Sequence, residues 1–180
     1  MVDAYDKTIS ALSNKGMTVT VILLNDWNPN TPDLVYPGTQ KNSNAFYYMF
    51  NAETEAGFDQ TKAIASFLAQ HYSGGNPNYG KVSNWIIGNE INNQQWNYMG
   101  AMDLTNYVKA YQKAFRVIYT AIKSTNANDR VYFSLDYNWM NEIDGKLKYG
   151  GKEIVDSFNS IANTQGQMDW GLAYHHIHAL

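Results

Sequence analysis

Glu90 is the residue with the clearest capacity for chemistry, because it follows the apolar run at residues 85–88 and stands directly after Asn89. A carboxylate at the end of a buried strand is costly unless it faces a polar cleft. A partly desolvated glutamate can donate a proton near neutral pH, as a general acid does. Adjacent strand residues point to opposite faces, so Asn89 and Glu90 share a cleft only if the strand bulges or ends there. Glu90 is therefore a candidate catalytic residue, and an exposed glutamate that caps a loop or helix is the alternative.

Polar and aromatic side chains follow every expected strand, and we take them as candidate substrate contacts. They are Asp26, Trp27, Asn89, Asn93, Trp96, Asp136, Tyr137, Tyr174 and His175. Amide and carboxylate groups hydrogen-bond to sugar hydroxyls, and indole rings offer a stacking face. Asn93 and Trp96, taken singly, fit a hydrogen-bonded surface loop equally well. One of Trp27 and Trp139 is expected to pack in the core, and an Asp after a strand, such as Asp26 or Asp136, commonly caps the loop or helix that follows.

Three histidines, His175, His176 and His178, stand together near the end of the sequence. Imidazole is a good metal ligand, but no well-spaced acidic residue accompanies these three. We therefore expect no metal and no cofactor, and interpret His175 or His176 as a cleft residue. His71, on an expected helix, is interpreted as structural.

The composition excludes several classes of protein. Apolar types make up 44% of the chain and charged types 16%, which predicts a sizeable core and argues against disorder. A net charge of −3 argues against a nucleic acid or an anionic membrane as partner. The absence of cysteine excludes disulfides, thiolate nucleophiles and Cys-ligated zinc. No apolar run approaches the ~20 residues of a membrane helix, and the first residues show no signal-peptide pattern.

Hydrophobic periodicity predicts four helix–strand units that position these residues. We expect helices at residues 2–14, 55–72, 104–122 and 152–162, and strands at residues 17–24, 82–88, 131–135 and 170–174. Asp103 is the expected N-cap of the third helix, and the first strand is expected to be buried on both faces. The side chains expected to point inward are Val2, Tyr5, Ile9 and Leu12 on the first helix, and Phe58, Ile64, Phe67 and Leu68 on the second. On the third helix they are Leu104, Tyr107, Val108, Tyr111, Phe115, Ile118 and Ile122, which hold helical spacing for five turns.

Strict alternation of helices and strands predicts parallel strands with right-handed crossovers, either as a doubly wound open sheet or as part of a barrel. Polar and aromatic residues follow all four strands, which favours the barrel, because an open sheet binds ligands mostly at one switch point. A complete barrel takes about 250 residues and eight strands. We therefore expect an α/β fold in which residues 1–180 form one domain, a partial (β/α)8 TIM barrel of four parallel strands and four helices. Its exposed strand edges favour self-association.

A long loop at residues 28–52 follows the first strand and carries Phe46, Tyr47, Tyr48 and Phe50. Loops of this length inside compact domains are usually functional or mobile. We interpret its aromatic residues as a wall over the barrel mouth, and a satellite hydrophobic cluster on the barrel rim is the alternative.

The run Trp85-Ile86-Ile87-Gly88-Asn89-Glu90 resembles the fourth-strand motif of the clan A glycoside hydrolases, which are retaining (β/α)8 enzymes. The resemblance implies that Glu90 is the acid/base and that Asn89 contacts a sugar hydroxyl. It also implies that the four strands are numbers three to six of the barrel, with Tyr174 and His175 at the end of strand six. The wider stretch is similar to an uncharacterised glycoside-hydrolase-like family, whose members have Gly-Asn-Glu followed by Asn and Trp.

Clan members carry their nucleophilic Glu at the end of strand seven, and a retaining mechanism needs two carboxyl groups ~5–5.5 Å apart. We therefore expect the nucleophile outside this chain, an inactive isolated segment, and Asp26 or Asp136 as the substitutes within it. The resemblance implies an oligo- or polysaccharide substrate, and we expect the full-length protein to be extracellular. A non-catalytic carbohydrate-binding barrel is the alternative. A nucleotide- or phosphate-binding open sheet is disfavoured, because no Gly-x-Gly-x-x-Gly or similar loop follows any strand.

Overall fold

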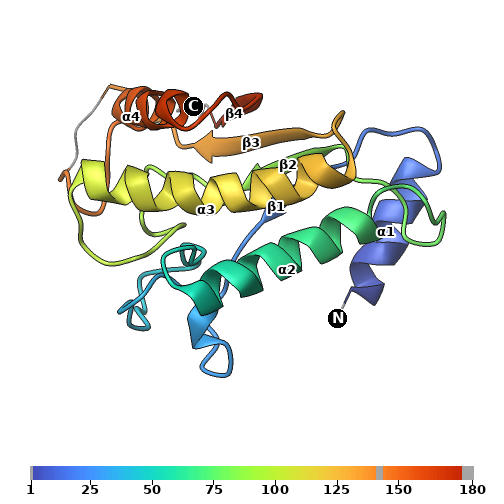
Figure 1. The fold of residues 1–180 in the computed structure, drawn as a ribbon, viewed down its shortest axis with the longest axis horizontal. Helices are drawn as coiled ribbons and strands as arrows, with labels where there is room; N and C mark the ends of the chain where they lie inside the picture. The colour runs from blue at the N-terminus through green and yellow to red at the C-terminus, as the bar shows by residue number, and fades with distance from the viewer. Residues whose placement is uncertain (1, 141–143, 176–180) are drawn as a thin grey trace, which may run out of the picture.

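The structure is a computed structural model and describes residues 2–140 and 144–175. Within these residues, four α-helices alternate with four strands (Figure 1). The elements in chain order are α1 (Asp3–Ser13), β1 (Thr20–Leu23), the 3₁₀ helix η1 (Pro32–Leu34), α2 (Glu55–His71), β2 (Asn84–Ile87), α3 (Leu104–Thr125), β3 (Arg130–Leu135), α4 (Gly151–Thr164) and β4 (Trp170–Tyr174). All strands pair in parallel in the order β1-β2-β3-β4. The predicted α/β fold, a partial TIM-barrel-like arrangement, is therefore confirmed.

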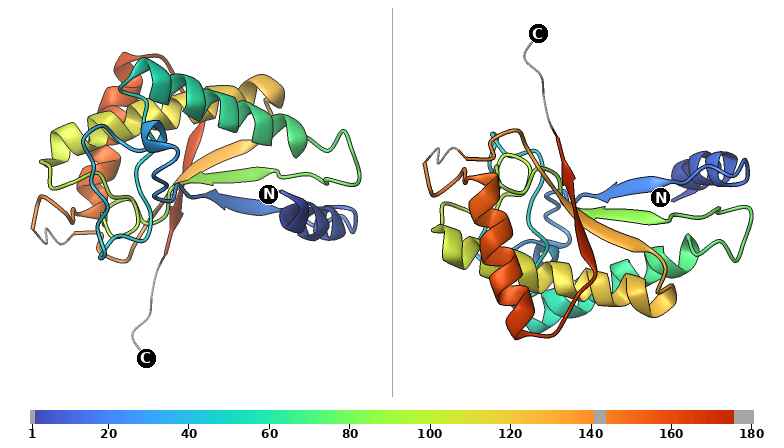
Figure 2. Two further views of the ribbon diagram at one scale, coloured as in Figure 1. Left: turned by 90° about the horizontal axis from the view of Figure 1, so that it is seen from below. Right: turned by 90° about the horizontal axis from the view of Figure 1, so that it is seen from above.

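The helices α2, α3 and α4 cover one face of the sheet, and α1 lies at its amino-terminal end (Figure 2). In register, Trp85 of β2, Val131 of β3 and Trp170 of β4 form one row of the face that packs on the helices. Phe158 of α4 meets Trp170 and Phe115 of α3 edge-on, with ring centroids 5.0 and 5.1 Å apart. Large aromatic side chains therefore fix α3 and α4 against the sheet. No helix among the described residues is long and apolar enough to cross a membrane.

The opposite face of the sheet has no helical cover within the described residues (Figure 2). Ile22 of β1 lies in register with Ile86, Tyr132 and Gly171 on this face. A Cβ at Gly171 would approach the Tyr132 ring to 2.4 Å, so only glycine lets that ring lie across β4. The expectation that β1 is buried on both faces is wrong, because β1 is an edge strand whose Ile22 remains 41% exposed.

The inward face predicted for α2 is also wrong for three of its four residues. Phe58, Ile64 and Phe67 are 38%, 39% and 51% exposed, whereas Leu68 packs against the core as expected. The residues that α2 buries are instead the small ones, Gly57, Thr61, Ala65 and Ala69. Small side chains let the backbone of α2 approach the rest of the domain closely, which pushes the large ones to the periphery.

The first helix departs from its prediction in a similar way. Of the expected inward residues of α1, Ile9 is buried, but Tyr5 and Leu12 are 64% and 39% exposed. Helix α3 follows its prediction, beginning at the N-cap Asp103, whose side chain accepts the Asn106 N–H at 3.0 Å. Periodicity therefore predicted the positions of both α1 and α3. It predicted the buried face correctly for α3 but not for α1.

Candidate functional site

Glu90 lies in a left-handed turn that follows directly after β2 ends at Ile87. Gly88 and Glu90 have φ angles of 74° and 42°, and Glu90 is the one non-glycine residue with positive φ in the described part of the chain. A left-handed backbone costs a residue with a Cβ about 1–2 kcal/mol, and residues held this way cluster at functional sites. The end of the strand removes the alternation that would place Asn89 and Glu90 on opposite faces. Asn89 is half-buried beside Glu90.

Two neighbouring elements hold this turn in place. The Ser134 hydroxyl of β3 accepts the Glu90 N–H at 2.8 Å. From α3, the Tyr111 hydroxyl donates to the Ile87 carbonyl at 2.5 Å, and the Tyr107 hydroxyl donates to the Ile91 carbonyl at 2.6 Å. Burial raises the pKa of both tyrosines well above the ordinary value of 10.0, so both remain protonated donors.

The carboxylate of Glu90 contacts His175, which follows β4. Glu90 Oε1 lies 2.9 Å from His175 Nδ1, and the two side chains are 16% and 35% exposed. The backbone N–H of His175 donates to the Leu135 carbonyl at 2.9 Å, which continues the β3–β4 pairing and fixes the histidine. The contact needs one proton between its atoms, donated either by Nδ1–H to the carboxylate or by the carboxylic acid to Nδ1. The contact therefore joins the loop after β2 to the end of β4 at a partly exposed carboxyl group.

Asp136, a candidate substrate contact, is 4% exposed and is used within the protein. Its Oδ1 accepts from the Asn92 amide at 2.5 Å and from the Asn138 N–H at 2.9 Å, and its Oδ2 accepts from the Asn138 amide at 3.0 Å. Its own N–H donates to Asn92 Oδ1 at 2.9 Å. Asp136 thus joins the loops after β2 and β3 beneath the surface, and the geometry gives it a positioning role.

The candidates after β1 lie apart from this network. Asp26 is exposed, and its Oδ1 accepts the N–H of the next residue, Trp27, at 2.7 Å. The half-buried ring of Trp27 packs against Tyr48, with ring centroids 5.5 Å apart. The Asp26 carboxylate thus accepts a bond from the adjacent residue and remains exposed to solvent.

Trp96 belongs to a group of rings, the aromatic stack, that consists of Phe46, Tyr47 and Trp96. The Trp96 ring stacks on Phe46 at 4.7 Å and on Tyr47 at 6.3 Å, with interplanar angles of 30° and 25°. Phe46 is 53% exposed, whereas Tyr48 in the same loop is 2% exposed and part of the core. The long loop thus supplies both an exposed aromatic face and a buried cluster.

The remaining candidates lie at the ends of β2, β3 and β4. The Asn93 N–H donates to the Glu90 carbonyl at 2.8 Å, so the loop from Glu90 to Trp96 begins as a tight turn. The Tyr174 hydroxyl donates to the Tyr137 carbonyl at 2.9 Å, and the Tyr137 side chain is 56% exposed. The structure therefore brings Glu90 together with His175, whereas Tyr137 and Tyr174 form a separate pair.

The histidines yield one site residue and one structural residue. The His71 ring stacks on Tyr79 at 3.9 Å, and its Nε2 lies 2.8 Å from Asp6 Oδ1, which ties α1 to α2. His176 and His178 lie outside the described residues. Within the described part, no group of three or more His, Cys, Asp or Glu residues is arranged to hold a metal ion.

Sequence reasoning missed the residues that support Glu90. Ser134 gives no signal, because a serine within a strand is common and its partner is 44 positions away. The spacing of Tyr107 and Tyr111 predicts only that they belong to the buried face of the third helix. Tyrosine rather than phenylalanine at two buried positions one turn apart is the signal that their hydroxyls have buried partners.

Residues 1–178, almost the entire chain, match the model of a family of unknown function, DUF5722. No curated protein matches the chain.

Proposed function

From the premise that the chain belongs to the DUF5722 family, a family of unknown function, we propose that Glu90 is the proton donor of a retaining glycoside hydrolase. The proposed reaction is hydrolysis of O-glycosidic bonds in an oligo- or polysaccharide. The observation that carries the proposal is the position of the Glu90 carboxyl group. It sits at the carboxyl end of a parallel strand, on a left-handed backbone, 2.9 Å from a histidine and 16% exposed.

In the proposed first step, the Glu90 carboxylic acid gives its proton to the glycosidic oxygen as the bond to the anomeric carbon breaks. The resulting carboxylate then accepts a hydrogen bond from His175 Nδ1–H, which stabilises its charge. In the second step, the same carboxylate removes a proton from the water that attacks the glycosyl-enzyme intermediate. His175 thus acts as a positioning residue for a group that must change protonation state twice.

In this proposal the carboxylate that attacks the anomeric carbon belongs to a residue outside this chain, as the resemblance to clan A implies. Asp136 is buried with both oxygens accepting hydrogen bonds, whereas Asp26 is exposed and bonded only to the adjacent Trp27 N–H among the described contacts. The exposed face of the aromatic stack and the amides of Asn89 and Asn93 supply contacts for sugar rings and hydroxyls.

The test is a leaving-group series. The 180-residue chain alone is expected to show no hydrolysis above blank, and a polypeptide extended through two further strands is expected to act with retention, followed by NMR of the product anomers. In that longer protein, Glu90→Gln should slow substrates with poor leaving groups most, because these depend on proton donation. Activated aryl glycosides should lose less in the glycosylation step, and azide should partly rescue deglycosylation.

Glu55→Gln, which changes an exposed carboxylate in the first turn of α2, is the matched control and should leave rates unchanged. If Glu90→Gln costs less than about tenfold, roughly 1.4 kcal/mol, Glu90 is not the acid. Hydrolysis by the 180-residue chain alone would mean that a carboxylate within it attacks, and Asp136 and Asp26 would be mutated first.

A non-catalytic carbohydrate-binding barrel is the second candidate. It is favoured by the burial of Asp136, both of whose oxygens accept hydrogen bonds, because this removes one of the two substitute nucleophiles within the chain. Experiments on the extended protein distinguish hydrolysis from binding alone. Saccharide binding that survives Glu90→Gln, without turnover of any substrate by the unmodified protein, would establish the binding function.

A further inference from the structure

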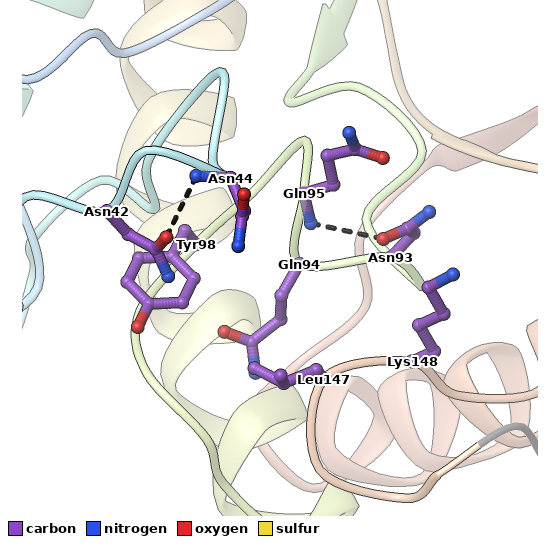
Figure 3. Close-up of a pocket in the computed structure, with 8 residues that line it drawn as sticks. All are labelled: Asn42, Asn44, Asn93, Gln94, Gln95, Tyr98, Leu147 and Lys148. Carbon is purple, nitrogen blue, oxygen red and sulfur yellow. Dashed lines mark hydrogen bonds between the residues drawn. The ribbon is translucent and has the colours of Figure 1, made fainter.

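We propose that a pocket lined in part by the loop that follows Glu90 binds an acidic sugar residue, one that carries a carboxylate or a sulfate ester. The pocket has a volume of about 330 Å³, and its lining includes amide side chains from two loops together with Lys148 (Figure 3). One of its residues, Asn93, donates its N–H to the Glu90 carbonyl at 2.8 Å. The inference rests on the proposed function, because it names the class of saccharide that the proposed hydrolase would take.

The amides of the pocket present hydrogen-bond donors. Asn42 Oδ1 accepts the Asn44 N–H at 2.9 Å, and Asn93 Oδ1 accepts the Gln95 N–H at 3.1 Å (Figure 3). A backbone N–H can only donate, so each of these two side chains must turn its oxygen to the backbone. The donor that each can offer to a ligand is therefore its NH₂.

The charge of the pocket points the same way. None of its described lining residues is an Asp or a Glu, and Lys148 adds an ammonium group. Within the described residues, the salt bridges of the lysines involve Lys113, Lys123 and Lys152, not Lys148. A neutral sugar offers hydroxyls that donate as well as accept, whereas a carboxylate or a sulfate only accepts. The pocket is therefore better matched to an anionic group.

Asp144 is the acidic residue closest to Lys148 in the chain, but its carboxylate accepts hydrogen bonds from backbone N–H groups. Its Oδ1 accepts the N–H groups of Leu147, Lys146 and Lys148 at 2.6, 2.8 and 3.0 Å. These bonds, that of Leu147 above all, lower the pKa of Asp144, and the Lys148 charge contributes less. Asp144 therefore shapes the loop that carries the lysine, and the Lys148 ammonium remains available to a ligand.

The loop is also fixed against the segment after β2, which sets the backbone position of Lys148. The Gln94 N–H donates to the Leu147 carbonyl at 2.8 Å, and the Gln94 side chain donates to the Lys146 carbonyl at 2.9 Å. Lys148 itself pairs with Asn93 in an isolated antiparallel bridge. The backbone at Lys148 is therefore fixed before a ligand arrives, which lowers the ordering cost of binding.

The test measures binding by calorimetry to the 180-residue chain at low ionic strength. The probes are trimers of galacturonate, glucuronate and mannuronate, each beside its uncharged methyl ester, and a trimer of galactose 6-sulfate beside its neutral parent. At least one acidic trimer should bind about tenfold more tightly than its neutral counterpart, as expected for a hydrogen bond to a charged group. The advantage should shrink as salt is added. The uronate and sulfate arms show which anion the pocket takes.

Variants assign the effect to the pocket. Lys148→Gln should abolish the preference for the acidic trimer and Lys148→Arg should retain it. Lys146→Gln is the matched control, because it removes the same charge from an exposed side chain of the same loop that does not line the pocket. Circular dichroism melts verify that each variant is folded.

The inference is overturned if no acidic trimer binds more tightly than its neutral counterpart, or if Lys146→Gln and Lys148→Gln have equal effects. Its failure is distinguishable from failure of the proposed function. Binding of acidic trimers that depends on Lys148, with no hydrolysis by the extended protein, would retain the pocket and reject the glycosidase. Hydrolysis that depends on Glu90, with no preference for acidic sugars, would do the reverse.

Discussion

Glu90 and His175 meet across an intervening strand. Glu90 follows β2 and His175 follows β4, while β3 lies between them in the sheet, and Glu90 Oε1 is 2.9 Å from His175 Nδ1. The two residues are 85 positions apart in the chain. The contact depends on the positions of three strands, so it reports on the integrity of the whole carboxyl edge of the sheet.

The Glu90–His175 contact should be measurable as a coupling free energy. We expect a double-mutant cycle with Glu90→Gln and His175→Gln, followed by urea denaturation near pH 6, to give about 0.5–1 kcal/mol, since the pair is only partly exposed. The matched control is Lys152 and Asp156 on the surface of α4, where the coupling should be smaller. Additive single-mutant effects at Glu90 and His175 would contradict the contact.

Ser134→Ala should destabilise the protein through the backbone of Glu90. Ser134 is fully buried, and its loss leaves the Glu90 N–H without the acceptor it has at 2.8 Å. The expected loss is about 1–3 kcal/mol in the free energy of unfolding, the cost of an unsatisfied buried donor. Ser66→Ala on α2, where the serine is half-buried, should cost little. Equal effects of the two substitutions would show that the hydroxyl does not hold the turn.

Gln112→Met and Gln94→Met should change stability in opposite directions, although both glutamines are 1% exposed. The Gln112 side-chain nitrogen and oxygen have no hydrogen-bond partner among the described residues, so a methionine of similar shape should stabilise by about 1 kcal/mol or more. The Gln94 amide donates to the Tyr149 hydroxyl at 3.0 Å and accepts the Met99 N–H at 3.0 Å, so its replacement should destabilise. Thermal melts of the two variants test both signs, and a destabilised Gln112→Met would indicate a partner for that amide.

Asp144 should contribute stability that is lost in acid. Backbone N–H groups, first that of Leu147, hold the pKa of its carboxyl below the ordinary value of 3.8. The folded state therefore binds the proton less readily than the unfolded state, so the stabilisation is present above pH 3.8 and disappears as the pH falls through the folded-state pKa. The stability difference between the unmodified protein and Asp144→Asn should be constant near neutral pH and shrink below pH 4. A difference that does not vary with pH would contradict this assignment.

Much of the fold could be predicted from the sequence, because alternating apolar periodicities specify helices and strands locally. The N-cap Asp103 and the buried face of α3 are examples, since both depend on residues within a few turns of one another. The face of α2 could not be predicted this way. Its stripe of Gly57, Thr61, Ala65 and Ala69 and its large apolar residues both repeat at helical spacing, and only close packing selects the small ones.

For the candidate site too, some features follow from the sequence and others only from the tertiary structure. The sequence by itself determined that the strands are parallel and that Glu90 and His175 belong to the same edge, because helices between successive strands require it. Only the tertiary structure decided that these two side chains meet, that Asp136 is buried, and that Lys148 lies beside Asn93. The physical reason is that strand order and apolar pattern fix which edge a residue occupies. Contacts of about 3 Å at that edge depend instead on register, on loop conformation and on the left-handed backbone of Glu90, which are set by partners distant in the chain.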